Sequence, residues 1–331
     1  MTLDERHIRR DDTRRASVRD RAAAPPPPVP GLISVGGASR SGSTLLTLLL
    51  GEIEGSVSVG ELRYIWSRGW RMNMLCGCGV PFRDCSFWRA VLTKAYGDLG
   101  AVPAAELERL QDSVTGIARL PALLAGAQSS AFDRRVRRLE AHLARLCDSI
   151  RRVAGARSVI DSSKLASYCF VLSRANGAEA RLVHLVRDSR AVAFSFLRHK
   201  HKPDIHWRQA EMKRFSPLKS AIDWNGLNGA MEAIGLRRPT TFMRYEDLAG
   251  DPSGEMRRVA PELASSSSFL GSGQGSVALA ENHTVSGNPL RFTAGDLQIR
   301  PDTEWRSRMR DRDRWLVTAA TAPLLARYGY L

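Results

Sequence analysis

Short runs of apolar residues alternate with longer segments of helical periodicity along most of the chain. The apolar runs predict strands at 31–37, around Val57, and at 157–161, 181–186 and 240–244. Helical spacing predicts helices at 165–176, 189–200, 207–235 and 303–327. Short apolar strands that alternate with helices are typical of a parallel sheet covered on both faces. We therefore expect an α/β fold in which helices flank a central parallel sheet.

Two stretches lie outside this alternation. Residues 62–154 are mostly helical from about residue 86, so we expect a helical insertion over the carboxyl edge of the sheet, where ligands bind in such folds. Residues 1–30 combine many arginines with the run Pro25 to Pro28, which predicts a disordered basic tail. With 331 residues, of which 43% are hydrophobic, the chain can bury the core that one enlarged domain over 31–331 requires.

The segment GLISVGGASRSGSTLLTLLLG, residues 31–51, predicts a strand, a tight turn and a helix start. Backbone N–H groups at such a helix start, together with the helix dipole, bind a phosphate-like anion. From Gly37 to Thr44 the spacing matches the phosphate loop of nucleoside triphosphatases, but Ser43 stands where that loop has lysine. The turn is thus expected to hold an anion but to suit a magnesium triphosphate poorly. An ordinary strand-to-helix turn is the alternative.

A second strand-to-helix junction lies in RLVHLVRDSRAVAFSF, residues 181–196. Arg187 is expected at the end of the strand, and Asp188 or Ser189 is expected to cap the helix. Ser195 follows about two helical turns into that helix. Arg187 and Ser195 meet only if the helix folds back beside the strand. A surface Arg–Asp pair and a helix-facing serine are the alternative.

Together the two junctions resemble the PAPS-dependent sulfotransferases, where PAPS is 3′-phosphoadenosine 5′-phosphosulfate. The family's 5′-phosphosulfate loop is similar to Arg40, Ser41, Gly42, Ser43, Thr44 and Leu45, and its 3′-phosphate site is similar to Arg187 and Ser195. The resemblance is to a bacterial type, with partial similarity to tyrosylprotein and carbohydrate sulfotransferases. It implies a P-loop-like sulfotransferase fold. It also implies transfer of a sulfuryl group from PAPS to an acceptor hydroxyl by in-line displacement, with residues 62–154 shaping the acceptor pocket.

Two further segments extend the resemblance. The sequence RYEDL at 244–248 looks like a segment common in the family, which implies that Tyr245 packs beside the adenosine of the cofactor. A tyrosine buried in the core at the end of a strand is the alternative. The segment ENHTVSGNPLRFTAGD, residues 281–296, is similar to the family's C-terminal cofactor loop. It lacks the Arg-Lys-Gly of that loop, so the resemblance carries over only Arg291 as a cofactor-binding residue.

Sulfuryl transfer needs a base for the acceptor hydroxyl and positive charge near the oxygen that bridges phosphorus and sulfur. Glu61, in SVGELRYIW, is similar to the glutamate base of tyrosylprotein sulfotransferases, and burial would have to raise its pKa to make it a useful base. Lys164, in VIDSSK, resembles the lysine that those enzymes place near the bridging oxygen. Arg40 is its partner or its substitute.

Each catalytic assignment has an alternative. Glu61 is equally consistent with a surface glutamate at a helix start. Lys164 fits a solvated position behind a helix cap formed by Asp161, Ser162 or Ser163. His283, in a loop with Asn288 and Arg291, is the rival general base.

Five cysteines, an odd number in a chain without an evident signal peptide, argue against a disulfide framework. Three of them cluster in LCGCGVPFRDCSFW, as Cys76, Cys78 and Cys85. A structural zinc ion needs four ligands, and no fourth cysteine or histidine lies close by in the sequence, although Cys147 or Cys169 could approach in space. We therefore expect small buried side chains in a compact loop. The reaction is expected to require no metal, because the backbone N–H groups of the turn, Arg40 and Lys164 stabilise the charge on the leaving oxygen.

The net charge of +15 and a pI near 10.3 imply an anionic partner. A nucleotide cofactor meets this need. A P-loop nucleotide or small-molecule kinase is the alternative among enzymes, and a basic nucleic-acid-binding protein is the alternative of another class. No apolar stretch approaches the roughly 20 residues of a membrane span, so we expect a cytoplasmic protein without integral membrane association. The expected acceptor is a small or biosynthetic metabolite, and nothing in the sequence indicates an oligomeric state.

Overall fold

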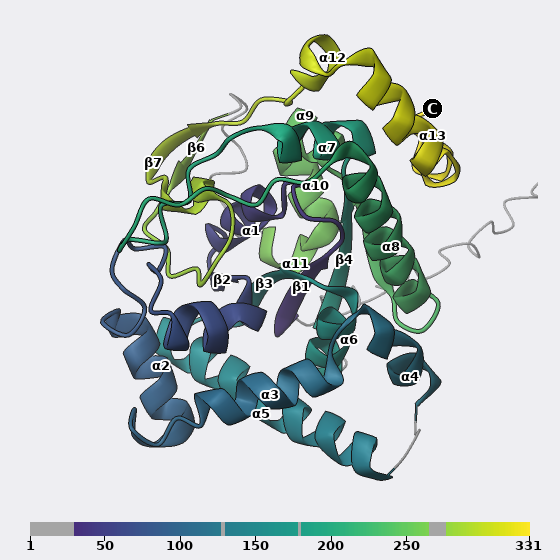
Figure 1. Ribbon diagram of the computed structural model, residues 1–331. Coiled ribbons are helices and arrows are strands. Elements are labelled where there is room, and N and C mark those ends of the chain that lie inside the picture. Colours follow the sequence, from purple (N-terminus) through teal and green to yellow (C-terminus); the bar gives the residue numbers. More distant parts are fainter. Residues whose placement is uncertain (1–29, 127–129, 178–179, 265–275) are drawn as a thin grey trace, which may run out of the picture.

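The computed structural model of the chain describes residues 30–126, 130–177, 180–264 and 276–331. At its centre lies a five-stranded parallel sheet of order β2-β3-β1-β4-β5 (Figure 1). The strands are β1 (Leu32–Gly36), β2 (Ser56–Gly60), β3 (Ser158–Lys164), β4 (Ala180–Val186) and β5 (Thr240–Arg244). The predicted α/β fold and its five strands are confirmed. The predicted basic tail, except for Pro30, lies outside the described residues.

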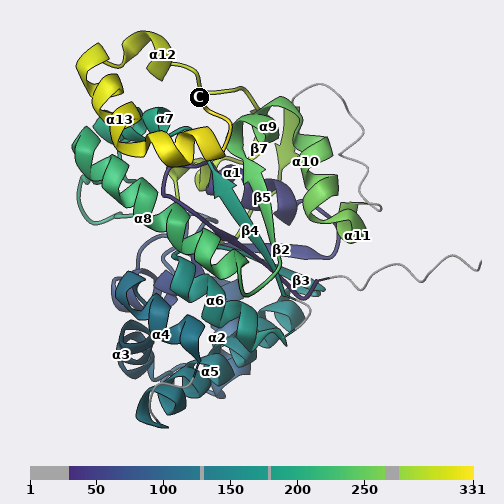
Figure 2. The same cartoon turned by 90° about the vertical axis from the view of Figure 1, so that its right-hand side faces the viewer.

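One face of the sheet is covered by helices that follow β1 and β5 (Figure 2). These are α1 (Ser43–Gly51), α9 (Tyr245–Gly250), α10 (Pro252–Val259) and α11 (Pro261–Ala264). Ile33 and Val35 of β1 are fully buried on this side, and Leu32 packs on the other. Because successive residues of a strand point to opposite faces, β1 has no solvent-facing side. An apolar strand of this kind is what a doubly covered parallel sheet requires.

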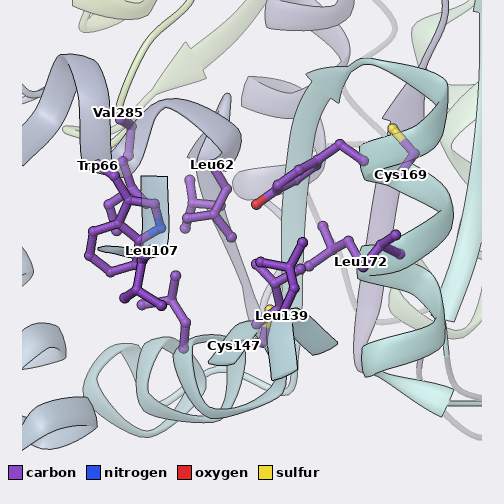
Figure 3. Close-up of a cluster of buried hydrophobic side chains, with 14 of the residues drawn as sticks. Leu62, Trp66, Leu107, Leu139, Cys147, Cys169, Leu172 and Val285 are labelled. Carbon is purple, nitrogen blue, oxygen red and sulfur yellow. The ribbon is translucent and has the colours of Figure 1, made fainter. Parts of the chain in front are cut away.

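The opposite face carries α6 (Ala166–Ala175), α8 (Pro217–Gly235) and the helices of the insertion. The insertion comprises η1 (Leu62–Tyr64), the π-helix η2 (Ile65–Arg71), α2 (Ser86–Tyr96), α3 (Ala104–Val114), η3 (Ile117–Arg119), α4 (Leu120–Ala125) and α5 (Ser130–Ala154). Figure 3 shows Leu62, Trp66, Leu107, Leu139 and Leu172 meeting in one apolar cluster. The insertion thus shares its core with the sheet and does not form a separate unit.

The insertion is helical as predicted, but most of it lies away from the carboxyl edge of the sheet. Both views place α2 to α5 toward the opposite end of the strands from α9 and from α7 (Ser189–Leu197). The reason is the apolar stripe of α5, which is buried against α2, α3 and α6 and consists of Phe132, Val136, Leu139, Leu143, Leu146 and Ile150. Within the described part of the insertion, η1 and η2 are the helices that contribute residues near the carboxyl ends of the strands.

Three predicted boundaries differ in the structure. The helix predicted from 207 begins only at Pro217, where the Ser216 hydroxyl caps it by accepting from the backbone N–H of Lys219. The residues proposed as a helix cap, Asp161 to Ser163, continue β3 as far as Lys164. The last predicted helix is divided into α12 (Trp305–Arg308) and α13 (Asp311–Arg327). Asp188 does cap α7, as predicted.

The C-terminal part of the chain returns over the sheet. β6 (Ser276–Leu279) and β7 (Gly295–Gln298) form a small antiparallel pair, with η6 (Pro289–Phe292) between them. α13 packs on α7 and α8. Among the described residues, no helix combines the length and the apolar character that crossing a membrane would need.

Candidate active site

A pocket of about 960 Å³ opens at the carboxyl ends of β1, β3 and β4. The helix that follows β1 and the helix that follows β3 lie on opposite faces of the sheet. Between two neighbouring strands of this kind a crevice forms at their carboxyl ends. The ends of the three strands each contribute a cation, namely Arg40, Lys164 and Arg187. Of the predicted site residues, those that line the pocket are Arg40, Gly42, Ser43, Thr44, Leu45, Glu61, Lys164, Arg187, Ser195 and Tyr245.

The turn from β1 to α1 has the backbone geometry of an anion site. Gly37 and Gly42 adopt positive φ values of 133° and 88°, and Gly42 is the N-cap of α1. A Cβ atom on Gly42 would lie 2.3 Å from the ring of Tyr245, so only glycine fits where this ring supports the turn. The hydroxyl of Ser41 is buried and has no hydrogen-bond partner among the described residues. The start of α1 therefore offers N–H groups and an unused hydroxyl to an anion.

Arg40 and Lys164 hold strained backbone conformations beside this turn. Among the described residues, Arg40, Asn73 and Lys164 are the non-glycine residues with positive φ, and the values for Arg40 and Lys164 are 69° and 65°. Such conformations cost about 1–3 kcal/mol each and persist where the surrounding structure enforces them. Here Arg187 donates to the carbonyl oxygen of Arg40 at 3.2 Å, and Gly37 N–H donates to that of Lys164 at 3.2 Å. Both pocket cations are therefore positioned by the backbone.

Glu61 and Lys164 form a buried ion pair in the pocket. Oε1 of Glu61 lies 2.7 Å from Nζ of Lys164, and both side chains are nearly covered. Burial alone would raise the pKa of Glu61, but the charges of Lys164 and Arg68 outweigh burial and lower the pKa below its usual range. The sequence-based expectation of a raised pKa is corrected: the pocket holds Glu61 as a carboxylate because two cations face it.

A buried carboxylate, Asp161, holds the two ends of this ion pair in place. It accepts hydrogen bonds from the hydroxyl of Ser34 at 2.9 Å, the hydroxyl of Ser163 at 2.5 Å and the backbone N–H of Leu62 at 3.1 Å. Leu62 follows Glu61, and Ser163 precedes Lys164. Asp161 therefore joins β1, β3 and the segment that carries Glu61. The sequence analysis considered Asp161 only as a helix cap.

Arg187 lies over an aromatic ring and pairs with a carboxylate at the pocket. Its guanidinium carbon is 4.4 Å from the ring centre of Tyr245, and its Nη2 lies 3.0 Å from a carboxylate oxygen of Asp302. Nε of Arg187 has no hydrogen-bond partner among the described residues. Ser195 lines the same pocket from α7, so the fold brings both residues to one pocket. Tyr245 contacts the arginine and the turn at Gly42, and thus supports both.

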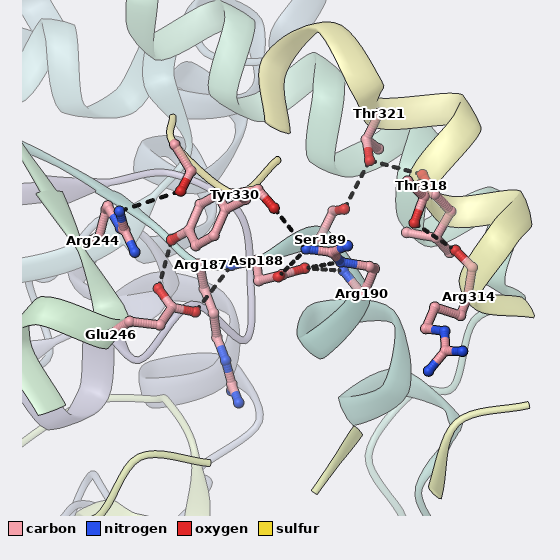
Figure 4. Close-up of polar contacts among 12 residues, drawn as sticks. Arg187, Asp188, Ser189, Arg190, Arg244, Glu246, Arg314, Thr318, Thr321 and Tyr330 are labelled. Carbon is pink, nitrogen blue, oxygen red and sulfur yellow. Dashed lines mark hydrogen bonds and ion pairs between the residues drawn. The ribbon is translucent and has the colours of Figure 1, made fainter. Parts of the chain in front are cut away.

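Contacts with Tyr330, near the end of the chain, and with Glu246 hold the turn that carries Arg187. Figure 4 shows Arg190 paired with Asp188, and Tyr330 donating to Glu246, while the guanidinium of Arg187 points away from this network. The backbone N–H of Asp188 also donates to Glu246 at 3.3 Å. Arg187 is therefore presented to the pocket from a rigid turn.

The structure reveals pocket residues that the sequence analysis did not assign. The segment between α7 and α8 contributes Lys200, Lys202 and Arg208, and the insertion contributes only Tyr64 and Arg68. The pKa of Lys200 is lowered, first by burial and then by the charge of Arg40. The signal for this wall was the basic run LRHKHK, which overlaps the end of the helix predicted at 189–200 and was given no role in the site.

Of the predicted residues, Ser41 is buried and does not line the pocket, and two further ones lie away from it. Arg291 is buried, with 1% of its surface exposed, and donates to the carbonyl oxygens of Leu75 and Thr284. His283, the rival base, lies with Nδ1 3.4 Å from Sγ of Cys85 and its ring stacked on Phe87. Neither residue lines the pocket. Their segment reaches it through Asn288, whose N–H donates to the hydroxyl of Thr44 at 3.2 Å.

The arrangement combines an anion cradle, three cations at the ends of strands and a carboxylate in one crevice. Such a set suits transfer of an anionic group, because the cations stabilise charge on a leaving group and the carboxylate can accept a proton. Comparison with protein families agrees with this chemistry: a model described as the sulfotransferase family matches residues 30–264. The match includes every predicted site residue that lines the pocket and ends before His283. No curated protein matches the chain.

Proposed function

The chain belongs to the sulfotransferase family, and from this membership we propose that it transfers the sulfuryl group of PAPS to a hydroxyl group of an acceptor. The observation that carries the proposal is the convergence of Arg40, Lys164 and Arg187 on one pocket that also holds the carboxylate of Glu61. A kinase would need a lysine at Ser43, which the turn lacks.

The pocket residues fit a donor with two separate phosphate groups. The turn at 40–45 offers backbone N–H groups at the start of α1 and the unpartnered hydroxyl of Ser41 to a phosphosulfate. Arg187 offers an unpartnered Nε atom, and Ser195 a hydroxyl, to a 3′-phosphate. Tyr245 lies between the two sites, where the adenosine would pack. Arg291, buried elsewhere, is not part of this proposal.

The proposed reaction is a single in-line displacement at sulfur. The acceptor oxygen forms a bond to sulfur while the bond from sulfur to the bridging oxygen breaks. The hydroxyl proton passes to Glu61, and the electron pair of the broken bond stays on the departing 3′,5′-ADP. Lys164 and Arg40 stabilise the charge that grows on this oxygen, and no metal takes part in this step.

The acceptor is proposed to be a small or biosynthetic metabolite that enters beside Glu61. The wall there is formed mainly by residues 200–215, with Lys202, Arg208 and Phe215 among them. Tyr64 and Arg68 are the contribution of the insertion. The acceptor pocket is thus shaped less by residues 62–154 than the sequence analysis expected.

Transfer from radiolabelled PAPS to a panel of hydroxylated acceptors tests the proposed function. We expect labelled product with at least one acceptor, no requirement for added magnesium, and loss of transfer in Glu61→Gln. The proposal fails if the chain binds neither PAPS nor 3′,5′-ADP, and equally if it turns over ATP with magnesium instead. Binding of duplex DNA that survives mutation of Arg187 would favour the nucleic-acid alternative.

Arg187→Ala tests the assignment of the 3′-phosphate site. The variant should lose about 10- to 100-fold of the preference for PAPS over adenosine 5′-phosphosulfate, because a charge-assisted hydrogen bond contributes about 1.5–3 kcal/mol. Arg181→Ala, which removes an arginine from the start of the same strand where it pairs with Glu262, is the matched control and should keep the preference. An unchanged preference in Arg187→Ala would remove Arg187 from the site.

A further inference from the structure

Outside the pocket, three cysteines and a histidine converge from distant parts of the chain. Cys76, Cys78 and Cys85 lie between η2 and α2, and His283 follows β6. Their ligand atoms all lie within 4.8 Å of one another. Sγ of Cys78 is 3.7 Å from Sγ of Cys85, and Nδ1 of His283 is 3.4 Å and 3.9 Å from Sγ of Cys85 and Cys76.

The separations of 3.4, 3.7 and 3.9 Å are close to those of a tetrahedral metal site, and the remaining pairs lie within 4.8 Å. Zinc–sulfur bonds of about 2.3 Å and a zinc–nitrogen bond of about 2.0 Å place neighbouring ligand atoms about 3.5–3.8 Å apart. We propose that Cys76, Cys78, Cys85 and His283 bind a structural zinc ion. Three thiolates and an imidazole are ligands that favour zinc over magnesium or calcium. Because four protein ligands leave no open position, the ion would stabilise the structure without taking part in the reaction.

The loop that carries the first two cysteines is folded around them. Cys76 N–H donates to the carbonyl oxygen of Val80 at 2.8 Å, and Gly79 N–H donates to that of Cys76 at 2.9 Å. Gly79 has a φ of 80°, which favours glycine. At Gly77, a Cβ atom would lie 2.1 Å from the side-chain oxygen of Asn282. The glycines thus allow a turn tight enough to direct both thiols to one point and to pack against the segment of His283.

The histidine is oriented by groups that do not bind the ion. The ring of Phe87 stacks on the imidazole, with 4.7 Å between ring centres and 5° between planes. The indole N–H of Trp88 donates to the carbonyl oxygen of His283 at 2.8 Å, and Gly77 N–H donates to that of Thr284 at 2.9 Å. Surrounding contacts of this kind fix ligand orientation in metal sites. Here they hold Nδ1 toward the three thiols.

The ion would join the cysteine loop to the segment that closes one side of the pocket. Arg291 already bridges these parts by donating to Leu75 and Thr284, and Asn288 touches Thr44 at the start of α1. The zinc proposal replaces the sequence-based expectation that the three cysteines are only small buried side chains in a compact loop. That expectation rested on the lack of a fourth ligand near the cysteines, and the fold supplies it from residue 283. The inference does not depend on the proposed function.

Zinc content of the full-length chain tests the proposal without any activity measurement. We expect about one zinc ion per chain after purification and gel filtration without chelator. Strong chelation should release it and lower the melting temperature, and cobalt should restore the stability with the thiolate charge-transfer and visible bands of tetrahedral Co²⁺. A folded chain that contains no zinc and binds none when it is added would overturn the proposal. So would a Cys78–Cys85 disulfide in the purified chain, since it would mark a redox pair.

Variants of the proposed ligands provide a second test of the zinc site. His283→Ala should lose the ion, whereas His283→Cys should keep it, because a fourth thiolate restores the ligand count. Cys147→Ala is the matched control: this cysteine is as buried as Cys76 but lies on α5, and its removal should leave the zinc content unchanged. Retention of full zinc occupancy in His283→Ala would exclude the site. If the alanine variant does not fold, the wild-type stoichiometry and the cobalt spectrum still decide.

Discussion

Lys164 controls the ionisation of Glu61, and a pH profile can measure this control. Burial raises the pKa of Glu61, and Lys164 is the largest influence that lowers it. In Lys164→Ala burial should prevail, so the pKa should rise. The wild type should show no acid limb from Glu61 above its ordinary pKa of 4.5, since the folded value lies below it. As the pH is lowered, the residual kcat/KM of the variant should begin to fall at a higher pH than that of the wild type. If both profiles fall at the same pH, Lys164 does not lower the pKa of Glu61.

The same variant separates catalysis from binding. If Lys164 stabilises the leaving oxygen, Lys164→Ala should lower kcat by about a hundredfold, as the loss of one preorganised charge often does. The dissociation constant of PAPS should change much less, because the cradle of backbone groups and Arg187 remains. Single-turnover rates and equilibrium binding of 3′,5′-ADP measure the two effects separately. A loss of affinity with unchanged turnover would make Lys164 a binding residue.

Asp302 is paired with Arg187, the residue proposed to bind the 3′-phosphate. Its carboxylate lies 3.0 Å from Nη2 of that arginine, and the pKa of Asp302 is lowered because Arg187 outweighs the effect of burial. Asp302→Ala should therefore strengthen binding of 3′,5′-ADP, by about tenfold, because a negative charge that competes with the ligand is removed. Calorimetry at fixed ionic strength measures the change. Weaker binding would mean that Asp302 positions Arg187 for the ligand.

At the residue scale, the sequence identified side chains close to a strand end but not their long-range partners. Arg40, Lys164 and Arg187 were found because the carboxyl ends of parallel strands meet at one edge of a sheet. The wall that includes Lys202 was missed because its residues form no regular element. Arg291 was predicted to bind the cofactor because it is an arginine in a loop. The sequence does not show whether such an arginine contacts a phosphate or, as here, buried carbonyl oxygens.

At the scale of elements, the hydrogen bonds of Asp161 make β3 the support of the pocket. Asp161→Ala would leave the hydroxyls of Ser34 and Ser163 and the N–H of Leu62 without their acceptor. We expect the free energy of unfolding to fall by about 3 kcal/mol, since each buried unsatisfied group costs about 1–3 kcal/mol. Urea denaturation measures the loss. Asp148→Ala, which removes a half-exposed carboxylate from α5, should change stability little; an equal loss in both variants would refute a special role for Asp161.

The elements themselves were predictable where the local pattern decides the structure. β1 and β4 are short and mostly apolar, and α7 has an Asp cap. The location of α2 to α5 was not predictable, because an amphipathic stripe shows that a helix is buried but not against which partner. The late start of α8 follows from the Ser216-Pro217 cap, whose signal lies inside a longer helical pattern.

At the scale of the whole molecule, the net charge of +15 comes from basic residues that lie both at the pocket and far from it. Basic residues surround the pocket, where Arg208 and Lys213 are exposed at its wall, but they also cover helices far from it, such as Arg134 and Arg145 on α5. A positive cleft attracts an anionic substrate over about one Debye length, which is roughly 10 Å at 0.1 M salt. Only charges near the pocket should therefore influence the capture of PAPS.

This distinction leads to a prediction for association. In the double variant Arg208→Gln/Lys213→Gln, kcat/KM for PAPS should fall several-fold at low salt and depend less on ionic strength than in the wild type. The matched variant Arg134→Gln/Arg145→Gln removes the same charge from the remote helix α5 and should retain the wild-type value and salt dependence. Steady-state rates between about 0.02 M and 0.5 M salt provide the comparison. If both variants lose the same amount, the net charge of the molecule, and not its placement at the pocket, attracts the cofactor.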